Sequence, residues 1–280
     1  MSVLERGSRV LRQVLSRDGG ADAPVSRGTS RTIGAQASWM LGLERQPFCD
    51  HASPRELFQD DAIAMQLNAL AQQLAEATML PILRGEPGSG KTSLLIQLMA
   101  QTGQDYHYFV ARGEERLAAE RVVVDMLRVL VRPVPARASE CFRELAHRLR
   151  VLVGDGRPAV LVVDDADAIA DQELERLLAV YDKLRTAVDG RFRLLLAADA
   201  TIEPRLARLH SQQLDSGQVF TTNIRPLNRN RIPGYLSHRL AMAGLPLDDE
   251  TLDALARDAM PLPREVERGA AEAINARWPD

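Results

Sequence analysis

The residues best suited to chemistry lie in the stretch GEPGSGKTS, residues 85–93, which has the G-x-x-x-x-G-K-[ST] spacing of a phosphate-binding loop. Glycines in such a loop let backbone N–H groups approach phosphate oxygens. Lys91 is expected to reach the outer phosphates as a point charge, and Thr92 to offer its hydroxyl to Mg²⁺. The predicted nucleotide-binding residues are Gly85, Glu86, Pro87, Gly88, Ser89, Gly90, Lys91, Thr92 and Ser93.

Two adjacent carboxylates are the best candidates to complete this site. The run VLVVDDAD, residues 160–167, places Asp164 at the end of four apolar residues, as expected at the carboxyl end of a buried strand. A carboxylate there is able to hold Mg²⁺ through water, and Asp165 beside it is able to orient or activate an attacking water. The alternative is a solvated acidic turn, which the phosphate-binding loop upstream makes the weaker interpretation.

Alternating strands and helices are expected to position these groups. Residues 78–83 predict a buried strand before the loop, and residues 92–101 predict a helix whose N-terminal dipole faces the phosphates. The alternation predicts a parallel sheet with helices on both faces. Further predicted strands are 106–111, 158–167, 191–200 and 219–227, and further helices are 60–76, 114–131, 138–153 and 171–188.

Three parts of the chain differ in pattern. Residues 1–38 predict a basic N-terminal helix and a flexible linker, and residues 39–227 a three-layer α/β P-loop core. Residues 228–280 predict a helical lid with helices at 229–244, 248–259 and 263–277. The N-terminal helix, within residues 1–15, fits a partner-docking or membrane-surface role, or packing on its own domain as a helix or frayed tail.

The composition narrows the class of protein. The 280 residues carry a net charge of −3, which gives no global attraction to nucleic acid or anionic membranes. Cys49 and Cys141 lie far apart, which favours a reducing compartment, and the five histidines lack zinc-site spacing. No apolar run approaches the roughly 18 residues of a membrane span, and no signal peptide is apparent. We therefore expect a cytoplasmic protein with no integral membrane span.

Together the phosphate loop, the acid-tipped strand and the Pro-Arg pair in the predicted lid resemble an AAA+ ATPase. Four further segments resemble ExeA/GspA-type secretion ATPases and the ATPase domain of DamX-like cell-division proteins. These segments are MLGLERQPF (40–48), FVARG (109–113), IRPLNRNRIPGYLSHRLAMAG (224–244) and PREVERGAAEA (263–273). The resemblance implies ATP and Mg²⁺ bound between core and lid, and a homo-oligomer. It also implies a protein partner in an envelope complex, which would hold the chain peripherally at the inner membrane.

The resemblance assigns two sensing positions. Asp199 lies just after RLLLAA (193–198), the apolar part of the predicted strand, where a polar group is expected to detect the γ-phosphate. Arg264 lies at the start of a lid helix, from which an arginine is able to reach the nucleotide. The alternatives are a loop aspartate and a surface arginine. With these two, the predicted catalytic residues are Lys91, Asp165, Asp199 and Arg264.

Two departures from the family pattern bear on turnover. Relatives often carry Glu where this chain has Asp165, and residues 214–223 lack the arginine that serves a neighbouring subunit in relatives. An arginine of this kind, called an arginine finger, contributes a factor of about 10³–10⁵ to the rate of hydrolysis. Its absence therefore favours slow hydrolysis or a nucleotide-gated assembly. Arg205 and Arg208 lie nearby but offset, where an ordinary solvated helix face is the alternative.

Three functions remain open at this point. The first is an ATPase that drives assembly of a secretion, pilus or cell-division machine, and the second is an ATP-gated switch or scaffold with little turnover. The third is a DNA-associated regulator of the transposition type, for which the supporting residues are Arg225, Arg229, Arg231 and Arg239. Salt bridges between lid and core explain those arginines as well, and the chain has no helix-turn-helix or zinc module. Nucleic acid is therefore not expected as a partner, whereas ATP and GTP both fit the loop itself.

Overall fold

The computed structural model describes residues 31–49, 53–76, 79–209, 219–257 and 259–279. Most of the predicted N-terminal helix and linker therefore lies outside the described residues. The chain divides into two compact units. Within the described residues, unit 1 contains 31–59, Gly88–Gly90 and 225–279, and unit 2 contains Asp60–Pro87 and Lys91–Ile224. The predicted division at residues 38/39 and 227/228 stays a prediction.

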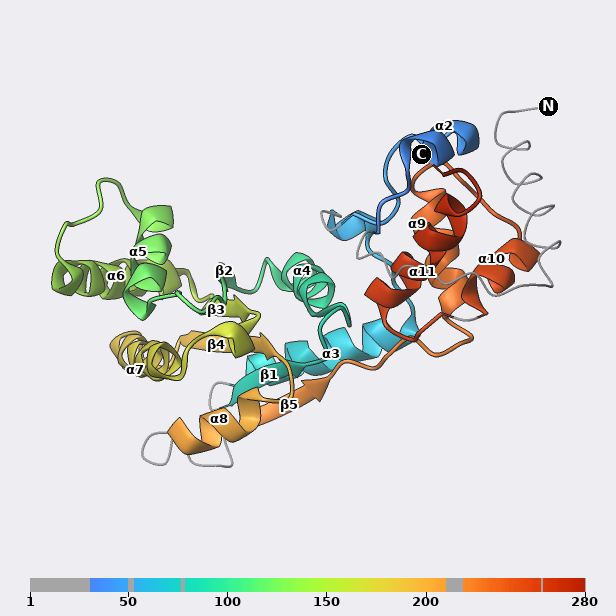
Figure 1. The fold of residues 1–280 in the computed structure, drawn as a ribbon. Helices are drawn as coiled ribbons and strands as arrows, with labels where there is room; N and C mark the ends of the chain where they lie inside the picture. The colour runs from blue at the N-terminus through green and yellow to red at the C-terminus, as the bar shows by residue number, and fades with distance from the viewer. Residues whose placement is uncertain (1–30, 50–52, 77–78, 210–218, 258, 280) are drawn as a thin grey trace. The chain divides into compact units, whose positions relative to one another are not determined.

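Unit 2 is built on a five-stranded sheet in which every neighbouring pair is parallel (Figure 1). The strand order is β2-β3-β4-β1-β5, so β1 and β3, which precede the two halves of the predicted site, flank β4. The strands are β1 Leu80–Arg84, β2 His107–Arg112, β3 Ala159–Asp164, β4 Phe192–Ala198 and β5 Val219–Asn223. The predicted parallel sheet is confirmed.

The central strands are buried on both faces, and their side chains alternate between two cores. In β3, for example, Leu161 and Val163 belong to one hydrophobic cluster, whereas Val160 and Val162 belong to another. A run of apolar residues without alternation is therefore what this strand requires. The strand stops at Asp164, short of the predicted residue 167, because Asp165 has a left-handed backbone (φ +53°).

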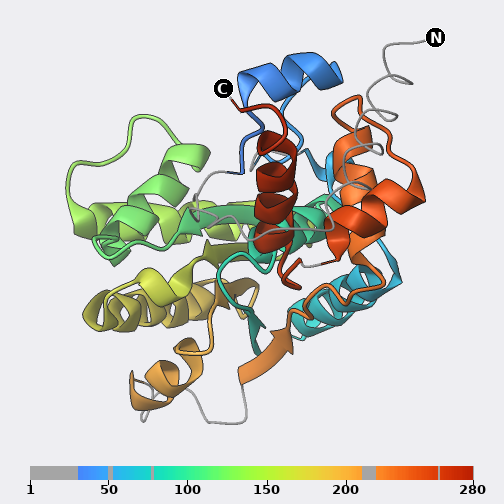
Figure 2. The same cartoon turned by 45° about the vertical axis from the view of Figure 1, so that its right-hand side comes forward.

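Helices cover both faces of the sheet (Figures 1 and 2). The first cluster contains the apolar faces of α5 Ala119–Leu130, α6 Ala138–Leu152, α7 Asp171–Ala187 and α8 Ile202–Leu209. The second contains those of α3 Asp61–Ala75 and α4 Lys91–Thr102. Two 3-10 turns, Val153–Asp155 and Ala166–Ala168, complete the unit. This three-layer arrangement confirms the predicted fold class.

Unit 1 is helical. It contains α2 Ala35–Leu41, a 3-10 turn at Pro54–Glu56, α9 Ile232–Ala241, α10 Asp249–Ala256 and α11 Pro263–Asn275. Its core joins Ile33, Leu41 and Phe48 to apolar side chains of the three C-terminal helices. The segment around MLGLERQPF therefore packs with helices that lie nearly 200 residues later, as the bond from the Glu44 amide to the Ala243 carbonyl oxygen (3.0 Å) also shows.

A buried carboxylate organises the polar interior of unit 1. Glu267 is 3% exposed and accepts hydrogen bonds from Tyr235 Oη (2.6 Å) and Arg31 Nη1 (2.7 Å). Arg239 lies 3.2 Å from the same carboxylate and also donates to the Cys49 carbonyl oxygen. Arg239 is therefore an internal ion-pair residue and not part of an exposed arginine group. Within the described residues, none of the helices combines the length and apolar character needed to cross a membrane.

Candidate nucleotide site

The loop between β1 and α4 has the backbone that close approach to phosphates requires. Gly88 and Gly90 adopt φ +82° and +99°, a left-handed conformation that other residues rarely take. The Gly85 amide donates to the Ala198 carbonyl oxygen of β4 (3.0 Å), which ties the start of the loop to the sheet. Lys91 opens α4, so the free amides and the positive dipole end of a helix of 12 residues lie at the loop.

Lys91 is held within the loop that precedes it. Its side chain is largely buried, with the residue 7% exposed, and Nζ donates to the carbonyl oxygens of Gly85 (2.9 Å) and Glu86 (3.3 Å). These are contacts that phosphate oxygens are able to replace, since an ammonium binds phosphate as a point charge. Ser89 Oγ is buried with no hydrogen-bond partner among the described residues, and a buried hydroxyl of this kind calls for a partner.

Thr92 and Asp164, which lie far apart in the sequence, are hydrogen-bonded to each other. Thr92 Oγ1, in the first turn of α4, donates to Asp164 Oδ2 at the end of β3 over 2.6 Å. Burial raises the pKa of the Asp164 carboxyl, although the Thr92 hydrogen bond opposes that effect. A nearby cation would favour the charged carboxylate, and hydroxyl and carboxylate oxygens are ligands that Mg²⁺ prefers. The structure therefore brings the two predicted metal-binding residues together in a way that fits Mg²⁺.

Asp165 lies in a tight turn directly after β3. Its left-handed backbone lets its amide donate to Asp164 Oδ1 (3.1 Å). Its own carboxylate accepts from Arg112 Nε of the neighbouring strand (3.2 Å), in a pair that is open to solvent. The carboxylate is thus held beside Asp164 and remains accessible to water.

Gly113 is a site residue that the motifs alone did not identify. Its amide donates to the Asp164 carbonyl oxygen (2.6 Å), and a Cβ at this position would lie 2.1 Å from the carbonyl oxygen of Asp165. Only glycine fits against this turn. The available signal was the place of the glycine at the end of FVARG, directly after the strand that pairs with β3.

Asp199 follows β4, as predicted, but its side chain already has partners. Its Oδ1 accepts from the amide (2.8 Å) and the hydroxyl (2.5 Å) of Thr201, and its own amide donates to Asp167 Oδ1 (3.0 Å). The Thr201 hydrogen bonds, the hydroxyl foremost, lower the pKa of Asp199. Asp199 is therefore a fixed, charged carboxylate at the carboxyl end of the sheet.

Three arginines complete the set of predicted residues. Arg264 is the second residue of α11, in unit 1, and its amide donates to the Gly88 carbonyl oxygen of the phosphate-binding loop (3.3 Å), which belongs to the same unit. Arg205 does not lie on a solvated face, because its side chain is only 13% exposed and its guanidinium is fully engaged within unit 2. Arg208 is exposed and lies 3.4 Å from the Asp171 carboxylate. Of the segment without arginine, residues 214–218 lie outside the described residues and 219–223 form β5.

Comparison with known proteins agrees with this geometry. Residues 75–206 match the family model described as an AAA domain. No curated protein matches the chain. Cdc6p from Pyrobaculum aerophilum has a similar structure (TM-score 0.60, 22% identity), with 83% of this chain and 63% of that chain covered.

Two further solved structures are similar. The ORC1 protein of Aeropyrum pernix, solved in complex with DNA, aligns with a TM-score of 0.59 at 16% identity over 90% of this chain and 66% of its own. The Walker-type ATPase of Pyrococcus abyssi aligns with a TM-score of 0.60 at 14% identity over 84% and 72%. The chain thus spans less than two thirds of the Cdc6p and ORC1 structures, and at these identities the likeness concerns the fold. Residues 75–206 therefore match an AAA domain, and the chain has the P-loop AAA+ fold.

Proposed function

We propose that this chain binds ATP with Mg²⁺ and hydrolyses it. The observation that carries the proposal is the 2.6 Å contact between Thr92 and Asp164, which come from separate parts of the chain. It places a hydroxyl and a buried carboxylate together beside Lys91 and the amides of a glycine-rich loop. Positioning and charge stabilisation of this kind are the main contributions that a protein makes to phosphoryl transfer.

Each residue then has a role that follows from its place. Lys91 and the amides of residues 85–93 bind the phosphates, and Thr92 and Asp164 hold Mg²⁺, which when bound neutralises charge that develops on them. Asp165 positions the attacking water from its accessible turn. Asp199 responds to the γ-phosphate, and the resemblance assigns the same role to Arg264. We expect slow turnover by the isolated chain, because no arginine finger is identified.

For the wider role, we propose that the nucleotide cycle drives assembly of a cell-envelope machine of the secretion, pilus or cell-division type. The support is the resemblance of the four segments to ExeA/GspA-type and DamX-like ATPases. A homo-oligomer, a protein partner and a cytoplasmic location, peripheral at the inner membrane through that partner, belong to this proposal. The absence of an arginine finger favours an alternative form of this proposal, in which the chain is an ATP-gated scaffold with little turnover.

A DNA-associated role is the second candidate. Its support is the likeness in fold to an ORC1 protein solved with DNA, together with Arg225 and Arg229, which are exposed. The net charge of −3 and the internal position of Arg239 weaken it.

Two experiments separate these functions. Phosphate release with Mg-ATP, beside a Lys91→Ala control, distinguishes an ATPase from a scaffold. Duplex DNA binding at two salt concentrations tests the DNA role, since phosphate contacts make the affinity fall steeply with salt. A weak, salt-insensitive shift, or none, would remove the DNA role.

A further inference from the structure

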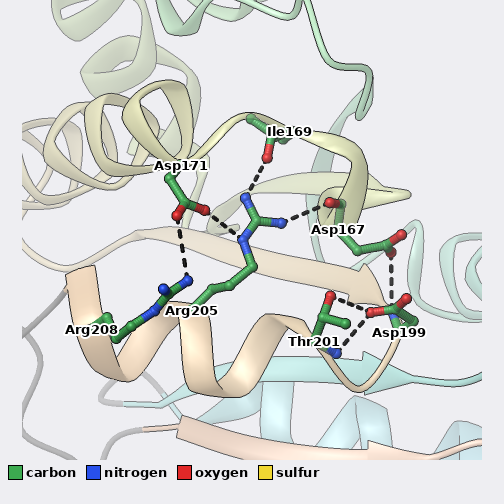
Figure 3. Close-up of polar contacts among 7 residues, drawn as sticks. All are labelled: Asp167, Ile169, Asp171, Asp199, Thr201, Arg205 and Arg208. Atoms are coloured by element: carbon green, nitrogen blue, oxygen red, sulfur yellow. Dashed lines mark hydrogen bonds and ion pairs between the residues drawn. The ribbon is translucent and has the colours of Figure 1, made fainter.

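The guanidinium of Arg205, on α8, contacts three residues of the segment that follows β3 (Figure 3). Its Nε donates to Asp171 Oδ1 (2.7 Å) and its Nη1 to the Asp167 carbonyl oxygen (2.7 Å). Its Nη2 donates to the carbonyl oxygen of Ile169. All three nitrogens of the guanidinium are therefore engaged, within a side chain that is largely buried.

This arrangement requires an arginine. The guanidinium is planar and always charged, and its donors point in fixed directions, so one group is able to hold two carbonyl oxygens and a carboxylate at once. A lysine would bring a single charged nitrogen on a shorter reach. Asp171 is the first residue of α7, so the contact also anchors the beginning of that helix.

Asp167 connects this contact to the predicted sensor. Its carbonyl oxygen accepts from Arg205, while its side-chain Oδ1 accepts from the Asp199 amide (3.0 Å). Asp199 in turn accepts from Thr201 at the beginning of α8, the helix that carries Arg205. Figure 3 shows the contacts that run from Arg205 through Asp167 and Asp199 to Thr201, and the backbone of α8 between Thr201 and Arg205 closes the circuit.

These contacts begin next to Asp164 and Asp165, the two carboxylates proposed to hold Mg²⁺ and position water. Asp167 lies in the short 3-10 turn that follows Asp165, and Asp164 ends the strand before it. The strands β3 and β4 are hydrogen-bonded neighbours, so the carboxyl ends of both point to the same edge of the sheet. Any movement of the turn relative to α8 would therefore change the separation of Asp165 and Asp199.

We infer that Arg205 is a positioning residue, which fixes the Asp164–Asp165 turn and Asp199 relative to each other for reading the γ-phosphate. The inference rests on the proposed nucleotide site, although Arg205 itself does not contact nucleotide. It also separates Arg205 from a finger that acts on a neighbouring subunit, because all three of its guanidinium nitrogens already donate hydrogen bonds within its own chain.

The first test needs no turnover. Hydrogen exchange of the Asp199 amide in the nucleotide-free protein should become faster in Arg205→Ala and in Arg205→Lys, because the Asp167 acceptor is released. The affinity for ADP should stay within about threefold of wild type, since the loop is untouched, while the ratio of ATP to ADP affinity shifts by threefold or more. Arg176→Ala is the control, since it removes an exposed arginine of α7 that pairs with Glu173.

The second test measures rate. In Arg205→Ala, kcat should fall by about 10- to 100-fold, as expected for a displacement of up to an ångström at the reacting groups. Mixing this variant with Lys91→Ala should not restore activity, because the Lys91→Ala subunits supply Arg205 only in trans.

Four outcomes would overturn the inference. The first is that hydrogen exchange of the Asp199 amide and the ratio of ATP to ADP affinity stay unchanged in Arg205→Ala, and the second is that this variant loses ADP affinity and thermal stability together. The third is that Arg205→Lys behaves like wild type. The fourth is that mixing Arg205→Ala with Lys91→Ala restores activity. If the wild type binds ATP without turnover, the proposed hydrolysis is wrong. Hydrogen exchange of the Asp199 amide and the ratio of ATP to ADP affinity still test the role of Arg205 in that case.

Discussion

Replacement of Gly113 by alanine should disable the site through a single methyl group. The added Cβ would lie 2.1 Å from the Asp165 carbonyl oxygen, whereas real Cβ contacts are essentially never shorter than 3.0 Å. The turn must therefore retreat by about 0.9 Å, or β2 must shift by a similar amount. The neighbours are backbone atoms of Asp164, which ends the buried strand β3, and of Asp165 in the turn after it, so neither movement relaxes easily.

The size of both effects follows from this displacement. A misplacement of about 1 Å at the reacting groups costs on the order of 10²-fold in rate, so kcat should fall by about that factor. Overpacking should lower the free energy of unfolding by about 1–3 kcal/mol. The affinity for ADP should change little, because the atoms nearest to the added Cβ belong to Asp164 and Asp165 and not to the loop at residues 85–93.

Phosphate release and urea unfolding measure the two quantities, and Gly154→Ala is the matched control. Gly154 has no atom within 4 Å of a built Cβ, so its replacement should change stability by less than about 0.5 kcal/mol. If Gly113→Ala releases phosphate and unfolds like the control, the close approach of β2 to the Asp164–Asp165 turn is not a constraint on the site, and the reasoning is wrong.

Two further predictions concern packing outside the site. Burial raises the pKa of Tyr108 to about 12, and its hydroxyl lies 2.7 Å from Thr102 Oγ1. Because the folded state thus favours the neutral phenol, the free energy of unfolding of the wild type should fall as the pH rises from about 10 towards 12. The fall should be smaller in Tyr108→Phe. Equal pH profiles of the two proteins in urea unfolding would contradict this. Glu267→Ala should lower the free energy of unfolding by about 3–5 kcal/mol, because it leaves Arg239 buried without its carboxylate, and a loss below about 1 kcal/mol would count against that ion pair.

The sequence was most informative where a structural requirement is local. The run at residues 159–163 is apolar because β3 is buried on both faces, and the glycines at 88 and 90 are needed by their own backbone angles. Those signals predicted the parallel sheet, the phosphate loop and the position of Asp164. The resemblance added the AAA+ fold, which the comparisons support, while the narrower ExeA/GspA or DamX type stays a prediction.

Features that depend on distant partners were not predictable in the same way. Arg205 binds backbone carbonyl oxygens 36 and 38 residues earlier, so its sequence context resembled an ordinary solvated helix face. The left-handed turn at Asp165 lies against Arg112 and Gly113, contacts with a separate part of the chain that no local pattern reveals. Similarly, residues 33–48 share a core with the C-terminal helices through long-range apolar contacts.

The most direct test of the central claim is steady-state phosphate release with saturating Mg-ATP across a series of protein concentrations, beside Lys91→Ala. We expect turnover that rises with protein concentration, as is typical of a site completed by assembly, and that disappears in the Lys91→Ala variant. Tight ATP binding with no phosphate release at any concentration would contradict the proposed ATPase and identify the chain as a nucleotide-gated scaffold.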